Sequence, residues 1–413
     1  MRPNGGGTSS GLLPQPVDLG ALLEPFAHRG VDLGLDRLRN ALRAGGEPET
    51  RFRAAQVAGT NGKGSICTFL HAILRAAGVH CGTYRSPHLV SWRERILIDD
   101  DWITAAALRA DLERWQATGR RHALTPFELL TAAAFDRFAL EQVEIAVLEV
   151  GLGGRLDATT VHPHRPVVGF ATIGMDHREH LGDSLEAIAR EKAAVMGPGT
   201  QAFSGPQPVA AATVLEAEAR RRGAELHWVE PLPDAAAGGM PLGLAGRFQR
   251  VNAAVAVAMA RALAHHGLPI DGDAIRRGLA EARWPGRLEQ RRWRSRPLLL
   301  DAAHNPPSAQ ALRQEIDAGQ GRRWLIGIQR QKEAPAMLRH LLGPEDEAAI
   351  VPPGGQAGWS SAELLEQEPG LRGRLRPVAT PVEGLEWICG QGPLPVVCGS
   401  IHLLGTVLPL LDG

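Results

Sequence analysis

The sequence predicts an α/β fold, with a large nucleotide-binding domain of the phosphate-loop type on a parallel sheet and a smaller C-terminal α/β domain. Apolar runs of strand length alternate with longer helical patterns, which is typical of a parallel sheet covered by helices. A glycine-rich loop follows the first apolar run. The alternation is interrupted at residues 284–297 and then starts again, which indicates a second domain.

The elements are assigned in chain order from these patterns. In the first domain we expect strands at 52–57, 81–84, 145–150, 167–173 and near 202–203. We expect helices from the glycine-rich loop to 77, then near 104–117, 125–141, 183–195, 208–222, 250–266 and 272–280. Residues 284–297 are charged and contain proline and glycine, so they are expected to form a linker. Strands then follow near 298–301, 324–328, 349–351 and 396–398, and the predicted domains are 1–287 and 288–413.

Length and composition exclude several classes of protein. The chain has 413 residues, 44% of them hydrophobic, which is enough for two folded domains. Its 45 acidic and 45 basic residues cancel, so no basic field indicates a nucleic-acid partner. The four cysteines have neither CxxC nor zinc-ligand spacing, which favours buried thiols in a reducing compartment. Residues 1–13 lack the apolar core of a signal peptide and no stretch approaches about 20 apolar residues, so we expect a cytoplasmic protein without a membrane partner.

The glycine-rich loop reads Gly-Thr-Asn-Gly-Lys-Gly-Ser at 59–65 and carries Lys63, one of only three lysines among 45 basic residues. Backbone N–H groups at a helix N-terminus bind phosphate, while a lysine adds charge and a serine hydroxyl a Mg²⁺ ligand. The strict GxxxxGK[ST] spacing is not met, and a tight turn is the plain alternative. The Gly-Lys-Gly-Ser run between a strand and a helix favours phosphate binding.

Three further residues lie at or near the carboxyl edge of the first sheet, where ligands of parallel sheets bind. Glu149 closes a strand and can hold Mg²⁺ or serve as an ordinary salt-bridge partner. His177 follows the 167–173 strand and can be a ligand or a solvated loop residue. Lys192 lies on the next helix, where a solvated face is the ordinary interpretation. In a chain that avoids lysine, a desolvated amine with a lowered pKa, open to carbamylation, is the sharper hypothesis.

The second domain repeats this arrangement. Asp301 and His304 follow a strand in the run Asp-Ala-Ala-His-Asn-Pro. Asn305 before proline can be simply a helix cap. Arg287 is a candidate phosphate clamp because a guanidinium grips phosphoryl oxygens, although most linker arginines are solvated.

Taken together, the motifs resemble those of the folylpolyglutamate synthase/dihydrofolate synthase family of the Mur ligase superfamily, from about residue 33 to 411. The matching runs are GLDR at 34–37, GTNGKGS at 59–65, SPHL at 86–89, RERI at 93–96, TPFE at 125–128, LEVGLGGRLDAT at 148–159, DH at 176–177, REK at 190–192, FQRVNAA at 248–254, PGR at 285–287, DAAHNP at 301–306 and CGSIHLLG at 398–405. The number and order of these motifs make chance a poor explanation.

The resemblance implies a role for each matching residue. ATP would be bound by Gly59, Thr60, Asn61, Gly62, Lys63, Gly64 and Ser65, with Lys63 on its phosphates. Ser65 and Glu149 would hold one Mg²⁺, while His177 and a carbamylated Lys192 would help hold a second and position the acyl phosphate. The nucleotide would also meet Gln249 and Asn252 on the adenine side, Arg287 and His304 at phosphate, and Asp301 at ribose. The pterin-bearing substrate would be lined by Ser86, His88 and Asp157, with residues 34–37 nearby.

The implied activity is an ATP-dependent amide ligation in folate biosynthesis and one-carbon metabolism. A carboxylate of dihydropteroate or a folate attacks the γ-phosphorus, Mg²⁺ and cations hold the acyl phosphate, and the amine of L-glutamate displaces phosphate. Positioning and charge neutralisation dominate such a reaction, and domain closure would exclude water. The implied catalytic residues are Lys63, His177, Lys192, Arg287 and His304, in an enzyme expected to be a monomer.

The chain departs from the family pattern at three places. The family usually has Asn where Thr160 stands and often Tyr where Pro126 stands, and both positions bear on the substrate pocket. It has Lys-Asp where this chain has Lys332-Glu333. We hypothesise that Lys332 contacts the incoming glutamate or the nucleotide.

Two other functions are considered. A cell-wall Mur ligase, acting on another carboxylate, carries a substrate domain before its phosphate loop, and the 58 residues here do not hold one of ordinary size. A non-catalytic nucleotide-binding paralogue would be expected to have lost at least one implied catalytic residue, yet all are present. No motif decides between dihydrofolate synthase, folylpolyglutamate synthase or both, and Asp157 with residues 34–37 favours a bifunctional enzyme.

Overall fold

The computed structural model describes residues 13–234, 238–316, 321–390 and 392–411, so the start of the chain and most of its 235–239 Ala/Gly stretch lie outside the described residues. The chain forms two compact units. The large unit comprises Met1–Pro87, Ser91–Gly243 and Gln249–Arg283, and the small unit comprises His88–Val90, Leu244–Phe248 and Trp284–Gly413. The predicted division after residue 287 stays a prediction.

Within the described residues, the large unit contains an eight-stranded sheet in the order β4-β3-β2-β5-β1-β6-β7-β8. The neighbouring strands β2, β5, β1, β6, β7 and β8 run parallel to one another. At the β2 edge, β3 and β4 extend the sheet in antiparallel fashion. Their bounds are β1 Arg53–Ala58, β2 Cys81–Tyr84, β3 Ile96–Ile98, β4 Asp101–Trp102, β5 Ile145–Glu149, β6 Val167–Phe170, β7 Gln201–Ser204 and β8 Glu225–Trp228.

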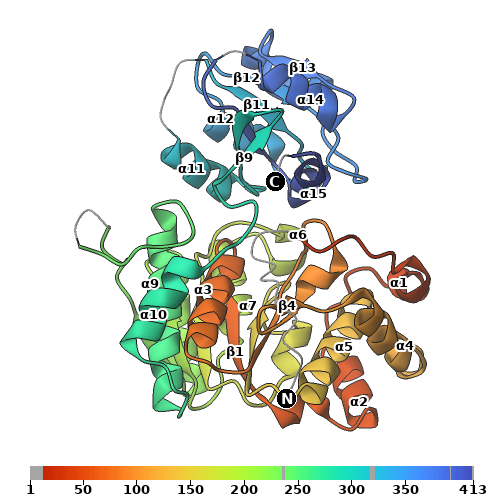
Figure 1. Cartoon of the computed structure of the whole chain (residues 1–413), viewed down its shortest axis with the longest axis vertical. Coiled ribbons are helices and arrows are strands. Elements are labelled where there is room, and N and C mark those ends of the chain that lie inside the picture. Colours follow the sequence, from red (N-terminus) through yellow and green to blue (C-terminus); the bar gives the residue numbers. More distant parts are fainter. Residues whose placement is uncertain (1–12, 235–237, 317–320, 391, 412–413) are drawn as a thin grey trace. The chain divides into compact units, whose positions relative to one another are not determined.

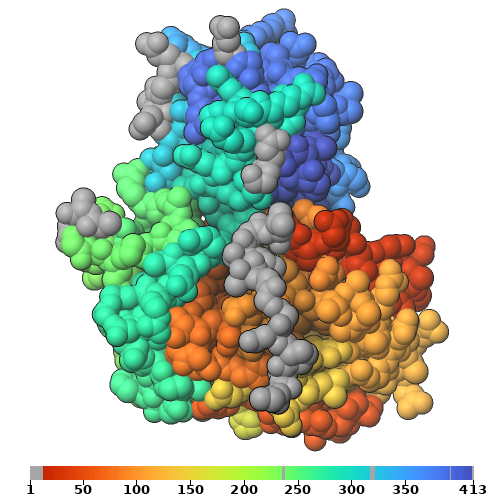
Figure 2. All heavy atoms as spheres, viewed as in Figure 1, coloured from red at the N-terminus to blue at the C-terminus, as the bar shows by residue number. Residues whose placement is uncertain are grey.

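Helices cover both faces of this sheet. One face packs against α1 Gly20–Ala27, α2 Asp36–Ala44, α4 Ala105–Arg121, α5 Pro126–Leu140, α7 Leu185–Ala193 and α8 Val209–Arg222. The other carries α3 Lys63–Ala76, α9 Phe248–His265 and α10 Gly272–Glu281. Figures 1 and 2 show α10 beside α3, where a Cβ on Gly278 would lie 2.5 Å from the Cα atom of Ile73. Glycine at 278 therefore lets α10 brace the helix that follows the glycine-rich loop.

The small unit has, among the described residues, a six-stranded sheet in the order β13-β12-β11-β14-β10-β9. The strands are β9 Glu289–Trp293, β10 Arg296–Leu300, β11 Arg323–Ile326, β12 Glu347–Ile350, β13 Leu375–Pro377 and β14 Val396–Cys398. The helices are α11 Pro306–Glu315, α12 Ala334–Leu341, α13 Ser361–Gln367, α14 Pro381–Ile388 and α15 Ile401–Val407. All strands but β9 run parallel, and one face of the sheet packs on α11, α12 and α13.

The predicted fold class is confirmed, and the predicted strands and helices recur within a few residues of their predicted ends. The linker predicted at 284–297 is wrong over most of its length, because β9 and β10 form an antiparallel hairpin there. Its two-residue turn, Arg294-Ser295, has φ angles of 48° and 67°. Neither residue favours positive φ, so the sequence carries no ordinary hairpin signal at this turn.

Among the helices that the described ranges contain, none combines the length and apolar character that a membrane span requires.

A buried carboxylate ties together the core of the small unit. Asp346 accepts hydrogen bonds from the side chains of Arg313 at 2.8 Å and Trp324 at 3.2 Å. It also accepts from the backbone N–H groups of Arg322 and Gly343, both at 2.9 Å. Removing it would leave an arginine and three N–H donors without this acceptor.

We expect Asp346→Ala to lower the free energy of unfolding of the small unit by about 3 kcal/mol, because a buried ion pair would be broken from one side. Urea unfolding followed by tryptophan fluorescence measures this. The exposed neighbour Glu345 provides the control, and Glu345→Ala should stay within about 0.5 kcal/mol of the parent. A loss below about 1 kcal/mol for Asp346→Ala would contradict the assignment.

Candidate active site

The glycine-rich loop joins β1 to α3 with a backbone that two glycines make possible. Gly59 and Gly62 have φ angles of 139° and 102°, in a region that side chains disfavour. A Cβ on Gly59 would lie 2.7 Å from the Cβ of Ala171, and one on Gly62 would lie 2.5 Å from Oδ1 of Asn252. The loop is therefore pressed against the end of β6 and against α9, and both contacts require glycine.

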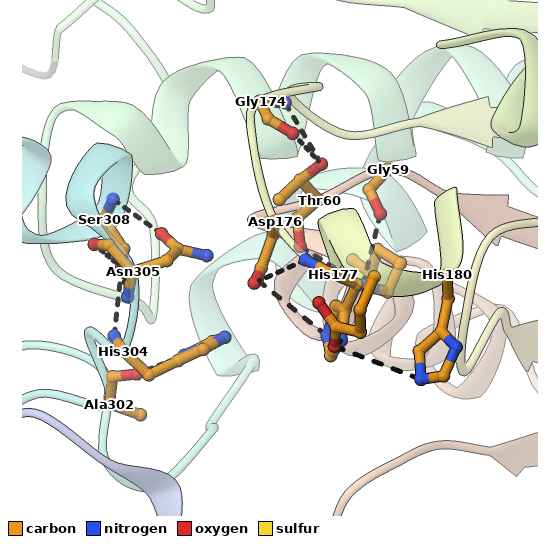
Figure 3. A network of polar contacts seen from close by, with 12 residues as sticks. Gly59, Thr60, Gly174, Asp176, His177, His180, Ala302, His304, Asn305 and Ser308 are labelled. Atoms are coloured by element: carbon orange, nitrogen blue, oxygen red, sulfur yellow. Dashed lines mark hydrogen bonds and ion pairs between the residues drawn. The ribbon is translucent and has the colours of Figure 1, made fainter. Parts of the chain in front are cut away.

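Two backbone N–H groups of the glycine-rich loop donate hydrogen bonds to the segment that follows β6, so they are not available to a ligand. The backbone N–H groups of Thr60 and Asn61 donate to the carbonyl of Thr172, at 2.8 and 3.1 Å. The Thr60 hydroxyl donates to the Gly174 carbonyl at 3.0 Å (Figure 3). The first N–H groups of α3, from Lys63 onward, have no acceptor within the helix and are the ones suited to an anion.

Two lysines converge on one carbonyl of this loop. Nζ of Lys192 donates to the Gly59 carbonyl at 2.9 Å, and Nζ of Lys63 donates to the same oxygen at 3.2 Å and to the Thr60 carbonyl at 3.2 Å. Burial, and then the charge of Lys63, lowers the pKa of Lys192 to about 7, against an opposing contribution from Asp176. The side chain of Lys192 is buried, while its carbamylation and its catalytic role stay predictions. An anion bound here would relieve the repulsion between the two ammonium groups.

The position of Lys192 depends on a close approach of the 151–157 loop to α7. A Cβ on Gly154 would lie 2.7 Å from the Glu191 carbonyl and 3.0 Å from the Cα of Lys192. The backbone N–H of Arg155 donates to the Glu191 carbonyl at 2.9 Å. Glycine at 154 therefore fixes the helix turn that presents the lysine.

Oxygen donors suitable for a magnesium ion lie at the same edge. The Ser65 hydroxyl accepts a hydrogen bond from Nε2 of Gln249 at 3.2 Å, and Oε1 of Gln249 accepts one from Nδ2 of Asn252 at 2.9 Å. Glu149 ends β5, is 5% exposed and accepts from the backbone N–H of Ser86 at 3.3 Å. A hydroxyl and a carboxylate are the hard donors that Mg²⁺ takes when nucleotide phosphates and water complete its shell. Among the described residues, no group of three or more His, Cys, Asp or Glu side chains could hold a metal ion by itself.

His177 follows the segment 172–174, which is hydrogen-bonded to the glycine-rich loop. It adopts the left-handed backbone conformation, with φ 52°, at the start of α6 Arg178–Leu181. Its N–H donates to Oδ1 of Asp176 at 3.0 Å, and its ring nitrogens lie 3.9 Å from Oδ2 of Asp176 and 3.7 Å from Oε1 of Glu179 (Figure 3). Because the Gly174 carbonyl is hydrogen-bonded to the Thr60 hydroxyl, the segment that carries His177 is held directly against the glycine-rich loop.

Asp157 holds the 151–159 loop from inside. Oδ2 accepts from the N–H groups of Gly151 and Leu152, both at 2.9 Å, and Oδ1 accepts from the N–H and hydroxyl of Thr159. Burial raises the pKa of this carboxyl, while these hydrogen bonds oppose the shift. The role of Asp157 in substrate binding stays a prediction, and its observed contacts are with its own loop.

Two side chains that the sequence did not single out complete this region. Gln56, fully buried on β1, donates to the hydroxyls of Thr159 and Thr160 at 2.8 and 3.0 Å. The Thr160 hydroxyl donates to the Gly154 carbonyl at 2.8 Å. Threonine, which replaces the usual asparagine here, therefore still closes the loop that follows β5. Phe127 lies over Gly151, where a Cβ would come within 2.7 Å of its ring. Residues within β1 and α5 give no local signal for these contacts.

The 34–37 segment is tied to the start of α5. The guanidinium of Arg37 donates to both carboxylate oxygens of Glu128 at 3.3 Å, and it pairs with Asp32 at 3.0 Å. Thr125 and Glu128 form a capping box, which leaves Pro126 at the first position of the helix, where proline is favoured. The departure at 126 therefore suits the helix start.

The candidate residues of the small unit lie at the carboxyl end of β10. Oδ2 of Asp301 accepts from the N–H of Leu288 at 3.0 Å, and Oδ1 accepts from the N–H of Ala303 at 2.9 Å. Burial raises the pKa of Asp301, and the charge of Arg287 opposes this. Nδ1 of His304 lies 2.8 Å from the Ala302 carbonyl, and Asn305 caps α11 (Figure 3). The bland interpretation of Asn305 as a cap is confirmed.

The large unit thus brings together the loop and the residues Glu149, Ser86, His177, Lys192, Gln249 and Asn252. The small unit holds Arg287, Asp301 and His304, together with the short segment that contains His88. Gln249 and Asn252 contact the phosphate loop, and their predicted place beside adenine stays a prediction.

Comparison with known proteins gives a consistent result. The Mur ligase middle domain model matches residues 57–202, and the model of the dihydrofolate synthetase C-terminal domain matches residues 287–355. The dihydrofolate synthase/folylpolyglutamate synthase of Escherichia coli K12 is 32% identical, over 94% of this chain and 94% of its own.

Solved structures agree with this similarity. E. coli FolC in complex with DHPP and ADP has a TM-score of 0.85 and 31% identity, over 96% of this chain and 99% of that one. The bifunctional folylpolyglutamate synthase/dihydrofolate synthase with Mn, AMPPNP and L-glutamate bound has a TM-score of 0.82 and 30% identity, over 96% and 98%. The expected family, fold class and assignment to the ATP-dependent ligases are confirmed. The chain belongs to the dihydrofolate synthase/folylpolyglutamate synthase family.

Proposed function

We propose that this chain joins L-glutamate to dihydropteroate, to folates or to both, with conversion of ATP to ADP, as a cytoplasmic monomer. The observation that carries the proposal is the convergence of Lys63 and Lys192 on the Gly59 carbonyl, beside the free N-terminal turn of α3. The ammonium of Lys63 and the first N–H groups of α3 make a site for a polyanion, and the buried amine of Lys192 lies beside them. The triphosphate of ATP has this chemistry.

Each candidate site residue of the large unit would have its own role in binding ATP. The N–H groups at the start of α3 and the ammonium of Lys63 would bind phosphate oxygens. Ser65 and Glu149 would hold Mg²⁺, and His177 with Lys192 would contribute to a second metal site. Bound magnesium supplies neutralisation of the charge on the phosphoryl oxygens. In the small unit, Arg287 and His304 would contact phosphate and Asp301 the ribose.

Lys192 suits carbamylation because its amine is buried and its pKa is about 7. A neutral amine can add to carbon dioxide, forming an N–C bond and releasing one proton, which yields a carbamate oxygen donor. Arginine at this place could supply the charge and could not react in this way.

On the acceptor side, the half-buried ring of Phe127 packs on the fully buried ring of Tyr84, with the centroids 5.9 Å apart, and keeps part of its surface exposed. Flat apolar surface of this kind suits the pterin ring of a folate. The acceptor carboxylate would attack the γ-phosphorus, and the glutamate amine would then displace phosphate from the acyl phosphate. The bifunctional name of the E. coli relative supports activity with both acceptors.

The proposal is tested by ADP release from purified protein with Mg-ATP and L-glutamate, using 7,8-dihydropteroate and tetrahydrofolate in separate reactions. We expect glutamate-dependent turnover with both. Turnover with one acceptor would assign a single activity. Nucleotide binding without ADP release on either acceptor would contradict the proposal and indicate a different acceptor acid or a non-catalytic paralogue.

Lys192→Arg should lower kcat by about 10²-fold or more, because a preorganised group beside the developing charge is lost even though the charge is kept. The matched control is Arg190→Lys, an exchange on the exposed face of the same helix, which should leave kcat within about twofold. Steady-state kinetics with saturating ATP measures both. Full activity of Lys192→Arg would exclude carbamylation and any other function that needs a primary amine rather than a positive charge.

Glu149→Gln should raise the Mg²⁺ concentration that gives half-maximal activity by about tenfold or more, since a charged oxygen ligand becomes neutral. The control is Glu144→Gln, an exposed carboxylate just before the same strand, whose Mg²⁺ dependence should equal that of the parent. Titration of Mg²⁺ at fixed ATP gives the result. An unchanged Mg²⁺ midpoint in Glu149→Gln would remove this residue from the metal site.

A further inference from the structure

We propose that Gln207 is a positioning residue for the phosphate loop, acting through the segment 171–173. The inference rests on the proposed nucleotide site and adds a residue that lies outside every motif of the sequence. Gln207 belongs to the connection between β7 and α8. It touches neither the loop nor any residue given a direct role above.

The side-chain amide of Gln207 brackets Thr172. Its Oε1 accepts from the N–H of Ile173 at 2.8 Å, and its Nε2 donates to the Ala171 carbonyl at 3.1 Å. Nε2 also donates to the Ser204 hydroxyl at 3.1 Å. One amide therefore fixes the peptide groups on both sides of Thr172 and ties them to the end of β7.

The bracketed residue is the one that docks the loop. The Thr172 carbonyl accepts hydrogen bonds from the N–H groups of Thr60 and Asn61. Two residues later, the Gly174 carbonyl accepts one from the Thr60 hydroxyl. The direction of this carbonyl depends on the two peptide groups that Gln207 holds. If they turned, both loop N–H groups would lose their acceptor, and the helix start that is suited to phosphate would lose its backing.

The local sequence makes Gln207 a stiff support. It stands between Pro206 and Pro208, whose rings fix φ and whose nitrogens cannot donate to a neighbouring strand. A residue that precedes proline is held to extended conformations, so the Gln207 backbone has little freedom. Gly205, before this run, lets the chain approach α9, where a Cβ would lie 2.4 Å from Cγ1 of Val251. The backbone at Gln207 therefore has little conformational entropy to lose, and the entropy lost when the amide is ordered is chiefly that of its own side chain.

The chemistry requires both a donor and an acceptor. Methionine has a similar length and offers neither, while glutamate can accept from Ile173 and, when ionised, cannot donate to Ala171. A protonated glutamate regains one donor. The two substitutions therefore separate the amide's hydrogen bonds from its volume.

The test is direct binding of Mg-AMPPNP by calorimetry, without acceptor or glutamate, together with thermal unfolding. Gln207→Met should raise Kd about tenfold, the effect of losing hydrogen bonds that organise the loop, with Tm lowered by no more than about 4 °C. Gln207→Glu should raise Kd similarly at pH 8, and the ratio of its Kd to that of the parent should fall as the pH is lowered toward 5. The control Gln201→Met, at the opposite end of β7, should bind like the parent.

Other outcomes overturn the inference. A Kd within twofold of the parent for Gln207→Met, whatever its Tm, would make Gln207 a structural residue only, as would a Kd ratio for Gln207→Glu that does not change with pH. Tight binding by the parent without turnover of any acceptor would contradict the proposed function and leave the positioning role intact. A parent that binds no nucleotide would overturn both.

Discussion

The candidate site depends on the docking of residues 59–61 against the chain that leaves β6. Two backbone hydrogen bonds to the Thr172 carbonyl, the Thr60 hydroxyl at Gly174 and the close approach of Gly59 to Ala171 hold the loop on one side. This docking sets the direction of the Gly59 carbonyl, on which Lys63 and Lys192 converge. It also sets the start of the segment that carries His177. The loop can therefore hold two repelling cations near each other before any anion arrives, as preorganised electrostatic sites require.

The sequence predicts those parts of the fold whose signal is local. The strand at 145–150 is apolar except for Glu149, and α3 follows a glycine-rich loop with helical periodicity, so each can be recognised within about ten residues. The β9–β10 hairpin was missed because its turn uses Arg294 and Ser295 at positive φ, and its strands are charged and punctuated by proline. The short strands β3, β4, β8 and β13 give equally little local signal. They are stabilised by pairing with neighbours, which a local pattern does not contain.

The same distinction holds within the site. Lys63, Glu149, His177 and Lys192 could be singled out as candidates because each occupies a recognisable place relative to a strand or in a motif. Gln56 and Gln207 act through hydrogen bonds to residues 103 and 36 positions away, and no spacing rule connects such pairs. Phe127 was within a recognised motif, but only the packing against Gly151 shows why a flat ring is needed there. What the sequence does offer for Gln207 is its place between two prolines.

The polar residues of the site divide into those that hold loops and those left for ligands, and the division follows from hydrogen-bond capacity. A carboxylate has about four acceptor positions, and Asp157 uses four on its own loop, so it shapes the site chiefly through the backbone it fixes. Asp301 binds two backbone N–H groups in the same manner at the end of β10 and retains capacity for a ligand such as a hydroxyl. Buried carboxylates with backbone partners thus appear in the loop after β5 of the large unit and at the end of β10 of the small unit, and each one keeps its own loop rigid.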